Sequence, residues 1–354
     1  MDQINVTPEI KYNAAKKTPA GRLLQWLGLR TQPMVKVYRG YGRDGQLQIF
    51  GHVLSLSPAA APQQRKGVLA NIGTLLRLFM VRPVANATVY LQWQQRRIST
   101  TTATDGFFHF QWAPESPTPA GWHPITVMYT QNGEDITSGN GLLYIPHRTQ
   151  FGCISDIDDT FLISHSGHLH KKLYVLLTRN PAARKPFEGV VQHYRLLSLG
   201  RTTAGTPNPF FYVSSSEWNL YDYLLAFADA WDLPQGVYLL NQLKTFSQLW
   251  QTGTGKHGTK FTRIARIMES YPHMSFVLLG DDTQQDPHIY EAVASHFPDR
   301  ILCIYLRQVS RKNRAATEVI VRRLTDKGIT CCYFEHSATA ITHSRQYGLI
   351  AMQD

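Results

Sequence analysis

The sequence predicts an α/β protein in two parts: an all-β sandwich, then a three-layer domain with a parallel sheet between two layers of helices. Over residues 35–148, apolar and polar side chains alternate with a period of two, which is typical of a sandwich of short strands. Over residues 149–335, near-continuous apolar strands alternate with amphipathic helices, which indicates a parallel sheet covered on both faces. The length of 354 residues also favours two domains over one.

A basic arm, residues 1–34, precedes the first part. Within it, GRLLQWLGLR has apolar residues at helical spacing between two arginines, and ANIGTLLRLFMVRP at residues 70–83 has the same character. Basic amphipathic helices lie on anionic membranes or, more commonly, pack against their own domain, and both alternatives stay open. The arm has no apolar run of the kind that a secretory signal needs.

Six or seven short strands account for the first part, because turn residues separate apolar alternating stretches. The Asp-Gly pair of TDGFFHF is the turn expected between two strands. No set of catalytic residue types occurs in this part, so we expect a scaffold or a binding module. The strands are VKVYRGYG, LQIFGHVLSL, ATVYLQW, RRISTTTATDGFFHFQW, HPITVMYT and GLLYIP.

In the second part, strands and helices take turns along the chain. One helix is expected over EWNLYDYLLAFADAW, with Ser216 before it as the N-cap, and another over KFTRIARIMESY. RKNRAATEVIVRRLTDKG predicts a final helix that leads into an edge strand, and residues 336–354 follow as a tail. The strands are FGCISDI, PFFYVSS, GVYLL, SFVLLGD, RILCIYL and ITCCYF.

The composition favours anionic partners without choosing among them. The net charge is +11 and the pI about 9.5, which suits a phospholipid surface, a phosphorylated substrate or nucleic acid. No nucleic-acid-binding motif is present, so no specific nucleic-acid partner is expected. No apolar run reaches the roughly 18 residues of a membrane span. The four cysteines have neither zinc spacing nor a disulfide framework, which predicts a reduced, cytoplasmic protein. The oligomeric state is not predicted.

Polar side chains follow the apolar strands of the second part. DIDDT follows one strand, SSS the next and GDDTQQD a later one. Because ligands bind beyond the carboxyl ends of the strands in open parallel sheets, we expect Asp156, Ser214 and Asp281 at one site.

These residue types suit the hydrolysis of a phosphomonoester. Asp156 and Asp281 can share Mg²⁺, which prefers oxygen ligands. A carboxylate can also attack phosphorus, and Asp158, two residues further on, can protonate the leaving oxygen and later activate water. Ser214 can donate to a phosphate oxygen, and Lys260 can supply positive charge. The sequence therefore predicts a Mg²⁺-dependent phosphatase with an aspartyl-phosphate intermediate.

Motifs in a fixed order carry a resemblance to a known family. DIDDT, YVSSSEWNLY, LPQGVYLL, KFTRIARIMESYP and LLGDDTQQDPHIYEAVASHFPDRILCIYLR resemble the phosphatidate phosphatase catalytic-domain family named after yeast actin patch protein one, a branch of the haloacid-dehalogenase-like (HAD) phosphatases. YRGYG, GHVLSL, TDGFFHFQW and GWHPITVMY resemble the β-rich region of bacterial relatives. The resemblance covers about residues 35–310. It implies a HAD-like Rossmannoid fold and hydrolysis of phosphatidate to diacylglycerol and phosphate, with the phosphorylated lipid met at an anionic membrane surface.

The resemblance also implies roles for single residues. Asp156 would be the nucleophile that accepts the phosphoryl group, and Asp158 the acid and base, with its backbone carbonyl on Mg²⁺. Thr160 belongs to the same first motif, Ser214 to the second and Lys260 to the third.

The fourth motif contributes metal ligands, and one of them is ambiguous. Asp281 is the first. Relatives usually carry serine where this chain has Asp282, so the second outer carboxylate is Asp282 or Asp286. Glu217 is a further departure, since it adds negative charge near the phosphate site.

Two other motifs have alternative interpretations. GTGKHGTK does not follow a strand directly and does not match a Walker A loop, so it is interpreted as a loop. Lys256 within it is a rival for the third-motif lysine, although a helix that starts at Lys260 suits the apolar spacing better. HSGHLH has metal-ligand residue types but is expected to be solvated, within a flap or cap at about residues 161–205.

Two further functions remain as alternatives. One is a HAD-type phosphatase for a small soluble phosphorylated metabolite. The other is a catalytically inert module that binds lipid or protein, against which the intact Asp156 and Asp158 argue.

Overall fold

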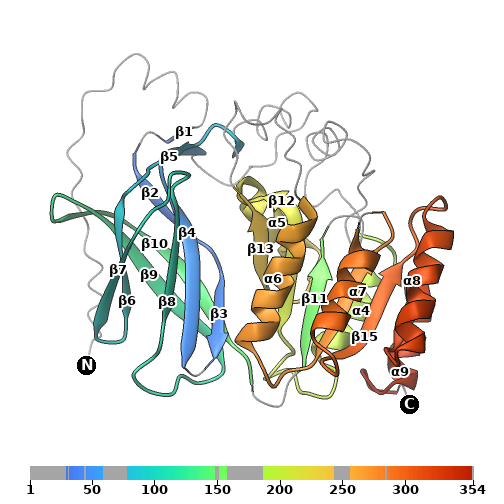
Figure 1. The fold of residues 1–354 in the computed structure, drawn as a ribbon. Helices are drawn as coiled ribbons and strands as arrows, with labels where there is room; N and C mark the ends of the chain where they lie inside the picture. Colours follow the sequence, from blue (N-terminus) through green and yellow to red (C-terminus); the bar gives the residue numbers. More distant parts are fainter. Residues whose placement is uncertain are drawn as a thin grey trace.

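Two sheets lie side by side in the computed structural model (Figure 1). The structure describes residues 29–30, 32–43, 45–58, 78–147, 151–157, 186–242, 256–283 and 285–352. A ten-stranded mixed sheet is formed by the N-terminal part of the chain and a six-stranded parallel sheet by the C-terminal part. The predicted α/β class, with strands first and alternating strands and helices after them, is confirmed.

The ten-stranded sheet is organised around one long strand, β4. On one edge β4 pairs with β2 and β3, and on the other with β8, while β3 leads on through β10 and β9 to β6 and β7. Hydrogen bonds therefore join all ten strands into one sheet, and the sandwich stays a prediction. The strands are β1 (Leu29–Arg30), β2 (Met34–Val37), β3 (Gly40–Arg43), β4 (Gln46–Pro58), β5 (Arg82–Pro83), β6 (Thr88–Trp93), β7 (Arg96–Thr101), β8 (Phe107–Trp112), β9 (Gly121–Gln131) and β10 (Glu134–Ile145).

The predicted Asp-Gly turn joins β7 to β8. The Asp105 carboxylate accepts a hydrogen bond from the Phe107 amide at 3.1 Å. Gly106 has φ of 76°, and a Cβ there would lie 2.7 Å from the Val53 carbonyl oxygen. Glycine is therefore required by both the backbone conformation and the space.

The six-stranded sheet has the strand order β13-β12-β11-β14-β15-β16, with all neighbours parallel. The chain runs outward in one direction from β11 to β13, then returns and continues from β14 to β16, so the order reverses beside β11. In doubly wound sheets this switch point is where ligands bind. The strands are β11 (Gly152–Asp156), β12 (Phe210–Glu217), β13 (Gly236–Asn241), β14 (Phe276–Asp281), β15 (Ile301–Arg307) and β16 (Cys331–Phe334).

Helices cover both faces of this sheet, with α6, α7 and α8 on the near face in Figure 1 and α4 and α9 on the far one. Buried aliphatic side chains of α6, such as Ile264 and Ile267, face the strands. Among the described residues, no helix has the length and apolar character to cross a bilayer. The helices are α4 (Val190–Ser198), α5 (Tyr221–Ala230), α6 (Lys256–Ser270), α7 (Asp286–His296), α8 (Arg314–Asp326) and α9 (Ser337–Gln346), with a 3₁₀ turn, η2 (Trp218–Leu220), before α5.

Three element boundaries differ from the sequence prediction. Ser216 is not an N-cap, because β12 continues to Glu217 and η2 follows before α5 begins. Helix α6 begins at Lys256, one turn before the predicted Lys260, since glycine weakens a helix without forbidding it. The predicted tail contains α9, where Ser344 accepts a hydrogen bond from the Tyr305 hydroxyl of β15 or donates one to it.

One hydrophobic cluster spans the two sheets, and a second lies within the ten-stranded sheet. The Tyr38 ring stacks on Trp218 with centroids 4.0 Å apart, and both side chains are buried. Polar contacts flank this stack: Gln48 donates to the Ser270 hydroxyl at 3.2 Å, and the backbone amide of Arg39 donates to the Tyr221 hydroxyl at 3.0 Å. The ten-stranded sheet is thereby held against η2, α5 and α6, which flank the parallel sheet.

Candidate active site

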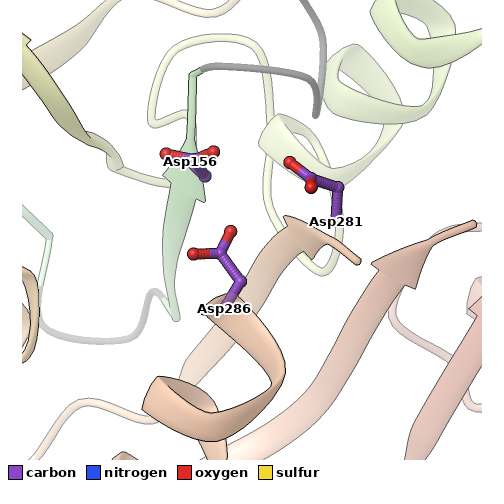
Figure 2. Close-up of side chains that lie close together, drawn as sticks. All are labelled: Asp156, Asp281 and Asp286. Atoms are coloured by element: carbon purple, nitrogen blue, oxygen red, sulfur yellow. The ribbon is translucent and has the colours of Figure 1, made fainter. Parts of the chain in front are cut away.

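Three carboxylates from separate elements meet at the carboxyl edge of the parallel sheet (Figure 2). Asp156 ends β11, Asp281 ends β14, and Asp286 is the first residue of α7. A ligand oxygen from each lies within 4.8 Å of the others, and all three residues are 0% exposed. We call these residues the carboxylate cluster. The sequence prediction that Asp156 and Asp281 come together is confirmed.

Lys260 on α6 partly neutralises the carboxylate cluster. Its Nζ lies 2.8 Å from an Asp156 carboxylate oxygen and also contacts Asp286. Burial opposes the charged amine, but the charges of Asp156 and Asp286 outweigh it and raise the pKa of Lys260 above its ordinary value. The lysine therefore stays protonated and places a positive charge against Asp156 and Asp286.

Residues next to the cluster fix two of its carboxylates. Thr283 donates from its backbone amide and its hydroxyl to Asp281 Oδ1, at 2.6 and 2.5 Å. Gly280 leaves room for Asp286, because a Cβ at position 280 would lie 2.6 Å from Asp286 Oδ2. Tyr290 packs at the same place and donates its hydroxyl proton to the Leu279 carbonyl at 2.7 Å. Thr283 thus fixes the orientation of Asp281, and the glycine at position 280 leaves the space that Asp286 occupies.

The structure separates Asp282 from the cluster. Asp282 Oδ1 accepts hydrogen bonds from the amides of Val309 and Ser310, both at 2.8 Å, and Oδ2 accepts one from the Tyr333 hydroxyl at 2.6 Å. These bonds hold the segment after β15. Of the two carboxylates that the sequence left open, the structure brings Asp286 into the cluster and uses Asp282 to anchor that segment.

Ser214 lies beside the cluster on the neighbouring strand. Val213 pairs with Asp156 across β12 and β11, so Ser214 is one residue further along the carboxyl edge. Its side chain is buried, and its oxygen accepts a hydrogen bond from the Ser216 amide at 2.9 Å. A serine hydroxyl can donate a hydrogen bond as well as accept one, as a phosphate-binding serine requires.

Several predicted site residues lie outside the described residues. Asp158 and Thr160 of the first motif are among them, as are His165, His168 and His170 of HSGHLH. Lys256 is placed at the start of α6, but its side chain is not described. At the end of the predicted flap, residues 190–198 form α4.

Two arginines near the cluster were not predicted. Arg307 ends β15 opposite Asp281 and donates to the Glu335 carbonyl at 3.1 Å and the Ser337 hydroxyl at 2.6 Å. Arg263 follows Lys260 by about one turn of α6, and burial lowers its pKa to about 10 although Asp156 acts in the opposite direction. Arg263 could have been predicted, because it follows Lys260 by three residues and so lies near it on the same helix. Arg307 could not, because the apolar strand that it ends has no feature that marks it as part of a site.

The cluster suits a divalent cation. Three buried carboxylates repel one another strongly, and one lysine compensates only part of that charge. Hard divalent ions such as Mg²⁺ prefer carboxylate oxygen ligands. The protein is therefore an α/β protein with a site at the switch point of its parallel sheet, and the cluster there can hold a cation together with an anionic ligand.

Residues 151–308 match the family model of the phosphatidate phosphatase APP1 catalytic domain, and the resemblance predicted from the sequence is confirmed over these residues. The chain is 31% identical over 160 residues to phosphatidate phosphatase APP1 of Saccharomyces cerevisiae, covering 44% of this chain and 25% of that protein. It is 27% identical over 164 residues to an uncharacterized protein of Schizosaccharomyces pombe, covering 46% of this chain and 26% of that one. The chain therefore matches about a quarter of the length of these relatives.

Among solved structures, a carbohydrate acetylesterase from Xanthomonas citri aligns with 89% of this chain and 73% of its own, at 9% identity and a TM-score of 0.33.

Proposed function

We propose that this protein is a Mg²⁺-dependent phosphatase of the HAD type, which hydrolyses a phosphomonoester through an aspartyl phosphate. The observation that carries the proposal is the buried carboxylate cluster with Lys260 at the carboxyl edge of the sheet. Phosphatidate is the proposed substrate, because residues 151–308 match the catalytic domain of a phosphatidate phosphatase. The net charge of +11 suits the approach to an anionic lipid surface, and a cytoplasmic location with peripheral membrane contact is part of the same proposal.

In this proposal the Asp156 carboxylate attacks phosphorus and the bond from phosphorus to the substrate alkoxy oxygen breaks. Asp158, placed by the motif rather than by the described structure, donates a proton to the leaving oxygen. Asp158 then takes a proton from water, whose oxygen attacks the acyl phosphate, releases inorganic phosphate and restores Asp156.

The remaining residues orient the substrate phosphate and neutralise negative charge at the site. Asp156, Asp281 and Asp286 would hold Mg²⁺, which reduces the repulsion between an anionic nucleophile and an anionic phosphate. Lys260 supplies positive charge beside Asp156, and Ser214 donates its hydroxyl proton to a phosphate oxygen. Each of these roles uses a side chain that lies at or beside the cluster.

The experiment is phosphate release from a substrate panel, with Mg²⁺ and with EDTA, for the wild type and Asp156→Asn. Turnover of dispersed short-chain phosphatidate is expected only with Mg²⁺, and the substitution should lower it by about 10⁴-fold or more, as loss of a nucleophile does. Asp326→Asn, an exposed carboxylate on α8, is the matched control and should retain wild-type rates. Rapid-quench mass spectrometry should locate the phosphoryl group on Asp156.

Two results would overturn the proposal. One is turnover that persists near the wild-type rate in Asp156→Asn. The other is a phosphoryl adduct on a different residue. Preference for sugar phosphates or nucleotides over phosphatidate would instead favour the soluble-metabolite alternative while leaving the chemistry in place.

A further inference from the structure

A cleft of about 600 Å³ lies between the two sheets, outside the carboxylate cluster. One wall comes from β3, β4 and β8 of the ten-stranded sheet, and the other from α6 and β13, which lie next to them in Figure 1. Pockets of this volume hold small organic ligands in other proteins. We call this space the intersheet cleft.

The α6 wall of the intersheet cleft is cationic. Arg263 and Arg266 line it, and they follow Lys260 on α6 at intervals of three residues. Burial first, and then the nearby charge of Arg266, lower the pKa of Arg263 to about 10. Within the described part of the chain, Arg266 has no ion-pair partner, and Glu269 is the one acidic side chain that lines the cleft. Two like-charged arginines on the same wall of the cleft favour an anion beside them.

The opposite wall provides neutral hydrogen-bonding groups. Gln46 and Gln48 alternate along β4 with buried core residues, and so point outward into the cleft, as do His109 and Gln111 on β8. The His109 ring nitrogen lies 3.2 Å from Gln48 Oε1. Burial and the charge of Arg266 lower the pKa of His109, which makes this wall a neutral donor and acceptor surface at pH 7.

Between the walls the cleft is aromatic. Phe50 and Trp218 lie with ring centroids 5.5 Å apart, and Phe107 adds a third ring. Such a surface packs against the apolar face of a ring or a short carbon skeleton. Long acyl chains would instead bury the amides and arginines of both walls without partners, which is unfavourable.

We propose that the intersheet cleft is a second anion site that binds a small phosphate ester, with its phosphoryl group on Arg263 and Arg266 and its organic part against Trp218 and the glutamine wall. Arginine is suited to this because its planar guanidinium donates two parallel hydrogen bonds to phosphate. Arg263 also interacts electrostatically with Asp156, so an anion in the cleft acts on the same arginine as the carboxylate cluster. The site does not depend on the proposed activity. The ester comes either from solution or from the headgroup of a membrane lipid.

The test uses the full chain carrying Asp156→Asn, in EDTA, with sn-glycerol 3-phosphate as the probe in isothermal titration calorimetry. Saturable binding is expected, with no binding of glycerol. Arg266→Gln should weaken it about tenfold, equivalent to the loss of one charge-assisted hydrogen bond. Gln48→Glu, which places a carboxylate opposite the arginines, should weaken it as well. Arg322→Gln, an exposed arginine on α8, is the matched control and should bind like the parent.

Ser214→Ala separates the two sites, since it removes a phosphate donor from the carboxylate cluster region and leaves the cleft intact. Unchanged binding in Ser214→Ala together with weaker binding in Arg266→Gln supports the proposal. Vesicles of phosphatidylcholine with one tenth phosphatidate are then added as a competitor of sn-glycerol 3-phosphate. If they compete, the ester comes from a lipid headgroup; if they do not, it is a free ester in solution. No saturable binding, or equal affinity in Arg266→Gln and Arg322→Gln, would overturn it.

Discussion

The two sheets bury different kinds of side chain. In the ten-stranded sheet the buried core is aliphatic and aromatic, with residues such as Val53, Leu91 and Val127 at 0% exposed. In the parallel sheet the strands are equally apolar along their length, but β11 and β14 each end in a buried aspartate. Buried carboxylates are costly unless compensated. Proteins retain such conflicts with stability mainly where function requires them, which is why the proposed activity is assigned to the carboxyl edge of the parallel sheet.

Removing the compensating charge should have the largest effect on stability. In Lys260→Met without metal, the three carboxylates lose their cation, and the free energy of unfolding should fall by about 3–5 kcal/mol. Saturating Mg²⁺ should then raise the melting temperature more than it does in the wild type, because the ion replaces the missing charge. Differential scanning calorimetry with EDTA and with Mg²⁺ measures both effects, and Lys312→Met, an exposed lysine, is the control. A variant as stable as the wild type in EDTA would contradict the assigned role of Lys260.

A side chain that crowds the carboxylate cluster should have the next largest effect on the free energy of unfolding. Gly280→Ala places a methyl group 2.6 Å from Asp286 Oδ2 and 2.8 Å from Tyr290 Cε2. We expect a loss of about 1–3 kcal/mol in the free energy of unfolding and weaker Mg²⁺ binding, because Asp286 must move. Urea unfolding and Mg²⁺ titration by calorimetry test the two parts, with Gly205→Ala, whose Cβ would meet nothing closer than 3.9 Å, as the control. Unaltered Mg²⁺ affinity would show that Asp286 is not a ligand.

A feature of the fold or the site could be predicted from the sequence when a short stretch of residues determines it. The strands of the parallel sheet were predicted because each is a continuous apolar run, and Asp156 and Asp281 were predicted as neighbours because they end two such runs. Lys260 was assigned from the family resemblance, and the apolar spacing of its helix favoured it over Lys256, although α6 begins earlier. These conclusions need only short windows of sequence and the geometry of parallel sheets.

The rest depends on packing between distant segments. Asp282 and Asp286 could not be distinguished, because the partners of Asp282 lie on Val309, Ser310 and Tyr333, which follow it by 27 residues or more. The intersheet cleft was likewise invisible, since it forms only where β4 meets α6, joined by the hydrogen bond between Gln48 and Ser270. No periodicity in the sequence reports such contacts.

Weakening the contact between the two sheets should lower stability by a smaller amount and leave Mg²⁺ binding unchanged. Tyr38→Leu removes the ring stacked on Trp218 and the hydrogen bond of 2.9 Å with His52. The free energy of unfolding should fall by about 2 kcal/mol, while Mg²⁺ affinity stays as in the wild type because the cluster is untouched. Chemical denaturation and a Mg²⁺ titration decide this, with Tyr347→Leu, an exposed ring, as the control. Loss of Mg²⁺ affinity in Tyr38→Leu would show that the ten-stranded sheet also shapes the cluster.

The smallest expected effect on stability comes from comparing Asp282 with Asp286, the two aspartates of the fourth motif, which are also compared in Mg²⁺ affinity. Asp282→Asn keeps the side-chain shape and an oxygen acceptor for Val309 and Ser310, but weakens bonds that a carboxylate makes more strongly. We expect a loss of about 1 kcal/mol in the free energy of unfolding and nearly unchanged Mg²⁺ affinity. Asp286→Asn should lower Mg²⁺ affinity strongly, because Asp286 is one of the three carboxylates that would hold the ion. Its effect on stability without metal should be small, because the lost ion pair with Lys260 offsets the relieved repulsion from Asp156 and Asp281. Calorimetric Mg²⁺ titration of the two variants side by side measures the difference; if both lost affinity equally, the assignment of Asp286 to the cluster and Asp282 to the anchor would be wrong.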